Sequence, residues 1–156
     1  MPDAFISYSS PDEQLARFIH RHLETSGLNP FLAPVSIRPG KHWSDATLAA
    51  LRSSAWVIFL ASRTACESDW VQQEIGAAIA LQKKLVPIVW DMLPSELPGW
   101  LANHQAINLR GSSIEDAQRQ LTAVAEWIKS DKATGLLNCG TGHRRPLLGW
   151  QVVAEQ

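Results

Sequence analysis

Short apolar runs alternate with stretches of helical periodicity along this 156-residue chain. Five of the runs have the length and composition of buried strands, and they lie at 4–8, 30–33, 56–61, 85–90 and 105–109. Polar segments rich in Ser, Pro and Gly separate the runs from the helical stretches. Strands that alternate with helices in this way are typical of βαβ units, so the pattern predicts a mostly parallel sheet.

Apolar residues at spacings of three and four predict the helices between the strands. The first helix follows the polar segment SSPDE, 9–13, and Gly27 has the position of a C′ glycine after it. Further helices are expected over 44–53 and 113–129. The last has a core stripe formed by Ile114, Ala117, Leu121, Val124 and Ile128.

The segment SDWVQQEIGAAIA, 68–80, predicts another helix, in which Trp70 and Glu74 share one stripe because they are four residues apart. The first residue of this helix can be predicted only to within about one turn. Asp69 with Gln72 has the spacing of a capping box, and so has Thr64 with Glu67.

Five short strands with intervening helices predict an α/β fold: a flavodoxin-like doubly wound, five-stranded parallel sheet in the order 2-1-3-4-5. Ligands of such sheets bind beyond the carboxyl ends of the strands, where the strand order reverses. The loops at that point are 9–13 and 62–70, so Trp70 and Glu74 are expected near the crevice. The domain is expected to span residues 1–130, and the aperiodic residues 131–156 form a C-terminal extension of unknown role.

Composition narrows the class of protein further. Apolar residues make up 46% and charged residues 19% of the chain, which is a globular balance. The net charge is −1 with no basic patch, so nucleic acid is not an expected partner. No signal peptide and no run of 18 apolar residues is visible, so we expect a soluble cytoplasmic protein without a membrane partner. Cys66 and Cys139 have no C-x-x-C partner, which agrees with a reducing compartment.

The sequence gives little support for a metal site, a phosphate-binding P-loop or a phosphoacceptor domain. His20 and His22 are two residues apart and point to different sides of a helix, so no metal site is expected. The segment CGTGH, 139–143, lacks the Lys-Ser/Thr of a phosphate-binding P-loop. A phosphoacceptor receiver domain would need an Asp at the end of the third strand, which reads FLAS instead.

Three segments together resemble Toll/interleukin-1 receptor (TIR) domains of the bacterial, NAD-consuming type. DAFISYSSPDE, 3–13, is similar to the first box of that family, and IRPGKHW, 37–43, is similar to its second box, the BB loop. ESDWVQQE, 67–74, resembles the W-x-x-x-E element that carries the catalytic glutamate. The resemblance covers residues 3–129.

The resemblance implies cleavage of the nicotinamide–ribose bond of NAD⁺, with NAD⁺ as substrate and no cofactor. Glu74 matches the catalytic glutamate and Trp70 the aromatic residue beside it. Implied substrate-binding residues are Tyr8, Ser9, Ser10, Asp12, Lys41, Trp43 and Asp45, and BB-loop residues for assembly are Arg38, Pro39 and Gly40. The implied output is a linear or cyclic ADP-ribose product, sensed by a downstream effector in anti-phage immunity, from a protein that forms homo-oligomers or filaments.

Several of these residues also have a purely structural explanation. A glutamate in an arbitrary helix is usually a solvated surface residue. Ser9 and Ser10 have the positions of residues that end a strand and begin a helix, with Pro11 at N1, and Asp45 has that of an early-helix acid. The alternative function is a non-catalytic adaptor that self-associates through the BB loop, for which the W-x-x-x-E acid would not be required.

Overall fold

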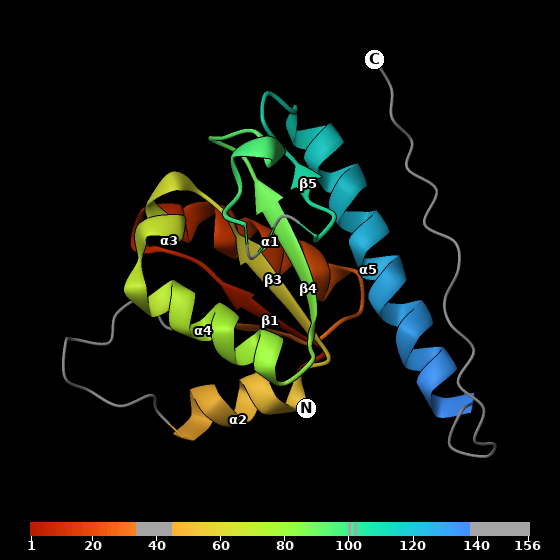
Figure 1. Cartoon of the computed structure of the whole chain (residues 1–156). Helices are drawn as coiled ribbons and strands as arrows, with labels where there is room; N and C mark the ends of the chain where they lie inside the picture. Colours follow the sequence, from red (N-terminus) through yellow and green to blue (C-terminus); the bar gives the residue numbers. More distant parts are fainter. Residues whose placement is uncertain (34–44, 100, 102, 138–156) are drawn as a thin grey trace.

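The computed structural model describes residues 1–33, 45–99, 101 and 103–137, and a five-stranded parallel sheet forms its centre (Figure 1). The strands are β1 (Ala4–Ser7), β2 (Pro30–Leu32), β3 (Trp56–Leu60), β4 (Lys84–Val89) and β5 (Ile107–Asn108). Their order is β2-β1-β3-β4-β5, and every neighbouring pair is parallel. The flavodoxin-like doubly wound sheet predicted from the sequence is therefore confirmed.

The central strands are apolar along their whole length because both faces of the sheet are covered. Every residue of β1 and β3 is buried, and Phe5 of β1 lies beside Val57 of β3 in the ladder. Parallel sheets with helices on both faces require such continuous apolar strands. Ser7, at the end of β1, is the one polar side chain in these two strands.

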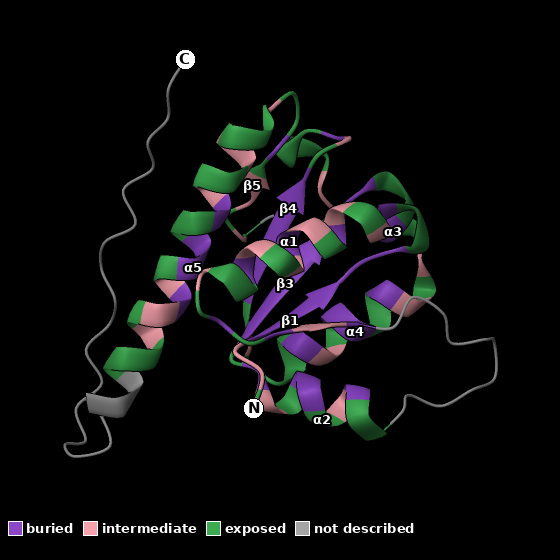
Figure 2. Ribbon diagram, turned by 180° about the vertical axis from the view of Figure 1, so that it is seen from behind, coloured by how far each residue is buried: buried purple, intermediate pink, exposed green. Residues whose placement is uncertain are grey.

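Helices cover the two faces of the sheet. They are α1 (Glu13–Thr25), α2 (Asp45–Ser53), α3 (Arg63–Glu67), α4 (Asp69–Ala80) and α5 (Ile114–Leu137), with 3-10 turns at Ser10–Asp12 and Pro94–Glu96. α1 and α5 lie together on one face, whereas α4, with α2 beside it, lies on the other (Figures 1 and 2). Gly27 after α1 has a φ of +87°, which confirms its predicted role as the C′ residue.

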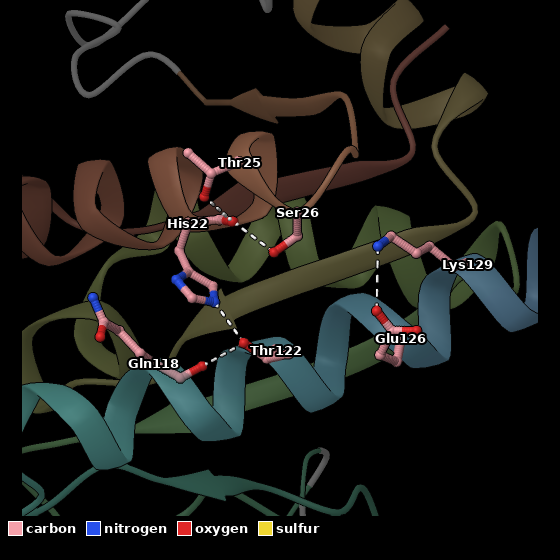
Figure 3. A network of polar contacts seen from close by, with 7 residues as sticks. All are labelled: His22, Thr25, Ser26, Gln118, Thr122, Glu126 and Lys129. Atoms are coloured by element: carbon pink, nitrogen blue, oxygen red, sulfur yellow. Dashed lines mark hydrogen bonds and ion pairs between the residues drawn. The ribbon is translucent and has the colours of Figure 1, made fainter.

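A small polar network joins the exposed sides of α1 and α5 (Figure 3). Thr122 donates its hydroxyl proton to the carbonyl oxygen of Gln118 at 2.8 Å. Since a hydroxyl has a single proton, the Thr122 oxygen accepts the 2.9 Å hydrogen bond from Nε2 of His22. This bond links residues 100 positions apart in the chain and sets the two helices side by side.

α5 differs from its prediction at both ends. Ile114, predicted as part of the core stripe, is 66% exposed, while Leu121, Val124 and Ile128 are buried as expected. The helix continues to Leu137 instead of ending near 129.

Contacts with the sheet hold this longer end of α5. Asp131 accepts a 3.1 Å hydrogen bond from the Trp56 indole and forms an ion pair with Lys84. Lys132 forms an ion pair with Asp3 at 2.9 Å. Residues 131–137 thus continue the helix α5, which Asp131 and Lys132 connect to the rest of the domain, and the predicted boundary at residue 130 falls within that helix. Among the described residues, no helix has the length and apolarity needed to cross a bilayer.

Candidate functional site

A hollow of about 200 Å³ lies at the carboxyl ends of β1 and β3, where the strand order reverses. Its wall comes from the loop after β1 and from the α3–α4 segment after β3. The lining residues are Tyr8, Ser9, Ser10, Pro11, Thr64, Ser68, Trp70 and Val71. Doubly wound sheets bind their ligands at this edge, so the hollow is the candidate site.

Two serines determine how the α3–α4 segment folds. Ser62 caps α3 and Ser68 caps α4, and each side chain accepts a hydrogen bond from the backbone N–H three residues further on. The capping boxes predicted to start at Thr64 and Asp69 are therefore wrong, and much of the expected loop 62–70 is the short helix α3. The break at Ser68 places the first turn of α4, with Trp70, against the hollow.

Glu74 is buried: its exposed fraction is 1%, although it is a glutamate on a helix. Ser7 Oγ, from the end of β1, donates a hydrogen bond to Glu74 Oε2. The other oxygen, Oε1, is also buried. Among the described residues, no donor has both the distance and the angle of a hydrogen bond to it. The interpretation of Glu74 as a solvated surface residue is thus excluded.

Burial raises the pKa of the Glu74 carboxyl to about 7, because desolvation disfavours the charged form. Hydrogen bonding from Ser7 and from the Trp70 side chain opposes this increase but is weaker. A carboxyl with such a pKa changes charge near neutral pH, which is a frequent property of residues in functional sites.

Tyr8 and Trp70 bring two aromatic side chains to the hollow. Burial of Tyr8 raises the pKa of its phenol, and the negative charges of Glu13 and Glu74 raise it further while Arg17 opposes them. Tyr8 therefore stays a neutral hydroxyl that donates or accepts a hydrogen bond. Trp70 is half-buried and offers an apolar ring with a polar N–H.

Asp12 connects the two loops beneath the hollow. Its exposed fraction is 2%, and its Oδ2 accepts hydrogen bonds from Ser9 Oγ at 2.7 Å and from Ser62 Oγ. Ser62 follows β3, whereas Ser9 and Asp12 follow β1. The carboxylate thus ties together the two segments whose ends form the wall of the hollow.

The predicted site residues divide into three groups. Tyr8, Ser9, Ser10 and Trp70 line the hollow, which brings together the predicted contacts of the first and third loops. Glu74 and Asp12 are buried close to it and are not lining residues, and Asp45 is an exposed first residue of α2. Arg38, Pro39, Gly40, Lys41 and Trp43 lie outside the described residues.

Sequence reasoning missed Ser7 and Ser62, the two hydroxyls that hold the buried carboxylates. Ser7 closes a run of apolar residues that reads as a strand, and a polar residue at the end of a buried strand is itself a signal, because its hydroxyl needs a partner. Ser62 follows the third strand at the predicted crevice, where the sequence predicts a loop and gives its side chain no specific role. Within the described part of the chain, no group of three His, Cys, Asp or Glu side chains is arranged to hold a metal ion.

Comparison with known proteins identifies relatives of this fold and sequence. The family described as TIR domain matches residues 4–122. A protein of Brachypodium distachyon named "Probable 2' cyclic ADP-D-ribose synthase BdTIR" is 28% identical over 97 residues, which are 61% of this chain and 43% of that protein. This chain therefore spans less than half the length of that relative.

Solved structures agree with the fold. The TIR domains of the activated Roq1 resistosome, which recognises the pathogen effector XopQ, superpose with a TM-score of 0.64 at 15% identity, over 78% of this chain and 97% of theirs. A TIR-STING receptor from C. gigas, in complex with 2',3'-cGAMP, gives 0.61 at 27% identity, over 78% of this chain and 39% of that receptor. A Toll-related receptor TIR domain from Hydra magnipapillata gives 0.59 at 18% identity, over 78% and 98%.

Proposed function

The chain belongs to the TIR domain family, and on that premise we propose that it cleaves the nicotinamide–ribose bond of NAD⁺. The observation that carries the proposal is the buried Glu74 carboxyl, which accepts a hydrogen bond from Ser7 and lies one helical turn from Trp70, a residue that lines the hollow. The relative named as a 2' cyclic ADP-D-ribose synthase supports a reaction that consumes NAD⁺. The products are nicotinamide and either ADP-ribose or a cyclic isomer of it.

The reaction needs one well-placed acid. The bond between the ribose carbon C1 and the nicotinamide nitrogen breaks, and its electron pair leaves with the nitrogen, so nicotinamide departs as a neutral molecule without a proton donor. Positive charge develops on the ribose, as in other glycosidic cleavages. The Glu74 carboxylate stabilises this charge in a site of low dielectric constant. Water then adds to C1 and releases a proton, or a hydroxyl of the same molecule adds and closes a ring.

The hollow supplies the remaining contacts. Trp70 offers an aromatic face to the nicotinamide or the ribose, and Tyr8, Ser9 and Ser10 offer hydroxyls to the ribose or the phosphates. Substrate must also gain access to the Glu74 carboxyl, which is 1% exposed in the protein alone. Lys41, Trp43 and Asp45 remain proposed contacts, and Arg38, Pro39 and Gly40 remain proposed residues of a self-association surface.

The test compares wild type with Glu74→Gln and with Glu67→Gln, a matched control at an exposed glutamate in the neighbouring helix. Each protein is incubated with NAD⁺ over a range of protein concentrations and at pH 6, 7 and 8, and the products are resolved by chromatography with mass detection. Wild type and Glu67→Gln should release nicotinamide and Glu74→Gln should not. The second product distinguishes hydrolysis from cyclisation, because the cyclic product is lighter by one water.

The second candidate function is a non-catalytic self-associating module. Its supporting observation is that Glu74 is sealed from solvent and does not line the hollow. It predicts that no variant changes NAD⁺, while light scattering still detects assembly that depends on protein concentration. Nicotinamide release by Glu74→Gln at the wild-type rate would exclude the enzymatic role of this carboxyl.

We further propose that the nucleotide product is a signal for a separate effector in the cytoplasm, in defence against phage. The TIR-STING receptor of C. gigas, which binds 2',3'-cGAMP, supports a connection between this domain type and nucleotide signalling. Phage challenge of bacteria that express wild type or Glu74→Gln tests this role. Protection by the wild type alone is expected, and equal protection by both proteins would contradict it.

A further inference from the structure

Ser7 occupies an unusual position for a serine. It ends β1, whose other residues are Ala4, Phe5 and Ile6, and its own side chain is fully buried. A buried hydroxyl without a hydrogen bond destabilises the fold, so a strand end in this place would normally carry an apolar residue. The hydroxyl therefore requires a specific partner, and that partner is Glu74, 67 residues later in the chain.

The geometry of this pair separates the two carboxyl oxygens. The single hydroxyl proton of Ser7 is donated to Oε2 of Glu74. Oε1 makes no complete hydrogen bond among the described residues, although the Trp70 indole lies close enough to lower the pKa of the carboxyl. One oxygen is thus fixed by the strand, while the carboxyl also interacts with the Trp70 side chain, which lines the hollow.

We propose that Ser7 is a positioning residue for the reaction, which holds Glu74 through Oε2 so that Oε1 is presented to the ribose and its developing positive charge. This inference rests on the proposed function. Ser7 does not line the hollow and acts through Glu74. Because Ser7 ends an interior strand, paired on both sides within a packed sheet, a regular element of the scaffold holds the carboxyl.

The bond also favours the charged form of Glu74, since a hydroxyl donates more strongly to a carboxylate than to a carboxylic acid. Titratable groups on α4 and on the elements around it are Asp69 in α4, Tyr8 after β1, Asp45 and Arg52 in α2, Arg63, Cys66 and Glu67 in α3, and Lys84 in β4. Tyr8 interacts electrostatically with Glu74. Lys84 is paired with Asp131. Among the described residues, the causes of the shifted pKa of Glu74 are burial, Ser7 and Trp70, without an ion pair.

The matched variants are Ser7→Ala and Ser54→Ala. Ser54 is fully buried like Ser7, but its hydroxyl donates to the backbone carbonyl of Ala50 at 2.7 Å. Ser54→Ala therefore removes a buried serine hydroxyl that has no connection to Glu74. Ser7→Cys, which keeps the size but only a weak donor, serves if Ser7→Ala does not fold.

The first readout is the pH dependence of kcat/KM for NAD⁺ cleavage, which reports the pKa of the free enzyme. Loss of a charge-assisted hydrogen bond should move the acidic limb upward by about one pH unit. From a pKa of about 7 in the wild type, that shift lowers kcat/KM about fivefold at pH 7 and changes it little at pH 9. Ser7→Cys should move the limb in the same direction by less, and Ser54→Ala should leave it in place.

The second readout does not depend on activity. The ¹³C resonance of the Glu74 carboxyl, assigned by its absence from the Glu74→Gln spectrum, is titrated in each variant. Its midpoint should be near pH 7 in wild type and about one unit higher in Ser7→Ala. The inference would be overturned, with NAD⁺ cleavage by wild type unaffected, if both Ser7 variants kept the wild-type titration midpoint and the wild-type acidic limb of kcat/KM. It would also be overturned if Ser54→Ala shifted both quantities as much as Ser7→Ala does. If wild type does not cleave NAD⁺, the proposed function fails and the positioning role fails with it, whatever the carboxyl titration shows.

Discussion

Replacing Glu74 by glutamine should stabilise the folded protein at pH 8 and leave its stability nearly unchanged at pH 4.5. The carboxyl has a pKa of about 7 in the fold, against 4.5 for the unperturbed group. Between these two values the folded state binds more protons than the unfolded state, so the free energy of unfolding decreases as the pH rises. Above pH 7 the wild type bears the full cost of a buried charge. Glutamine has the same shape and never bears this cost.

The magnitude follows from the shift. The difference between 7 and 4.5 is 2.5 pH units, and at 1.36 kcal/mol per unit it corresponds to about 3 kcal/mol. For a chain of this size each kcal/mol moves the melting temperature by roughly 3 °C. The Glu74→Gln protein should therefore melt roughly 9 °C above wild type at pH 8, with a difference that declines toward zero at pH 4.5.

The assay is thermal unfolding followed by circular dichroism at half-unit steps from pH 4.5 to 8.5, supported by urea unfolding at 25 °C. Each curve is plotted as variant minus wild type, so that the pH dependence of all other groups cancels. Glu67→Gln, at an exposed position, should give a flat line near zero. A Glu74→Gln difference that does not change with pH, or a loss of stability at pH 8, would refute the idea that desolvation dominates this carboxyl.

Two further substitutions test the surroundings of the hollow. Trp70→Phe keeps an aromatic face and removes the N–H that lowers the pKa of Glu74, so the acidic limb of kcat/KM for NAD⁺ should move to higher pH; an unchanged limb would exclude the influence of the indole. Asp12→Asn keeps the size but replaces the one carboxylate oxygen that accepts from both Ser9 and Ser62 by a neutral amide oxygen, which is a poorer acceptor for both hydroxyls. It should cost about 1–3 kcal/mol in urea unfolding, and a cost below about 0.5 kcal/mol would show that the link does not hold the loops together.

The sheet could be predicted because burial on both faces leaves a strong local signal. β3 reads WVIFL and β4 reads KLVPIV, and few other structures explain such short apolar runs between helical patterns. The end of α5 could not be predicted in the same way. Its last turns are held by contacts of Asp131 with Trp56 and Lys84, which are 75 and 47 residues away in the chain.

The positions of the candidate site residues could be predicted in part, whereas the residues that hydrogen-bond to them were missed. Trp70 and Glu74 were located near the crevice from the order of the strands alone, and the burial of Glu74 could not be read from its own helix. The buried carboxyl accepts a hydrogen bond from Ser7, whose position in an apolar run gives no indication of which partner it will meet. The helix starts were wrong for a related reason: Thr64 and Asp69 have the spacing of capping boxes, but Ser62 and Ser68 cap the two helices, and local spacing alone does not select among such neighbouring candidates.

The long C-terminal end of α5 has a consequence for which side of the domain can change without affecting the hollow. Residues Met1 to Asp3 lie with Asp131 and Lys132 around one shallow depression at the amino ends of the strands, and the ion pair of Lys132 with Asp3 joins them. The hollow is at the opposite edge of the sheet. Met1 to Asp3 and residues 131 and 132 of α5 therefore lie on the side of the sheet away from the hollow. Changes at this side of the domain are therefore expected to leave the lining of the hollow as it is.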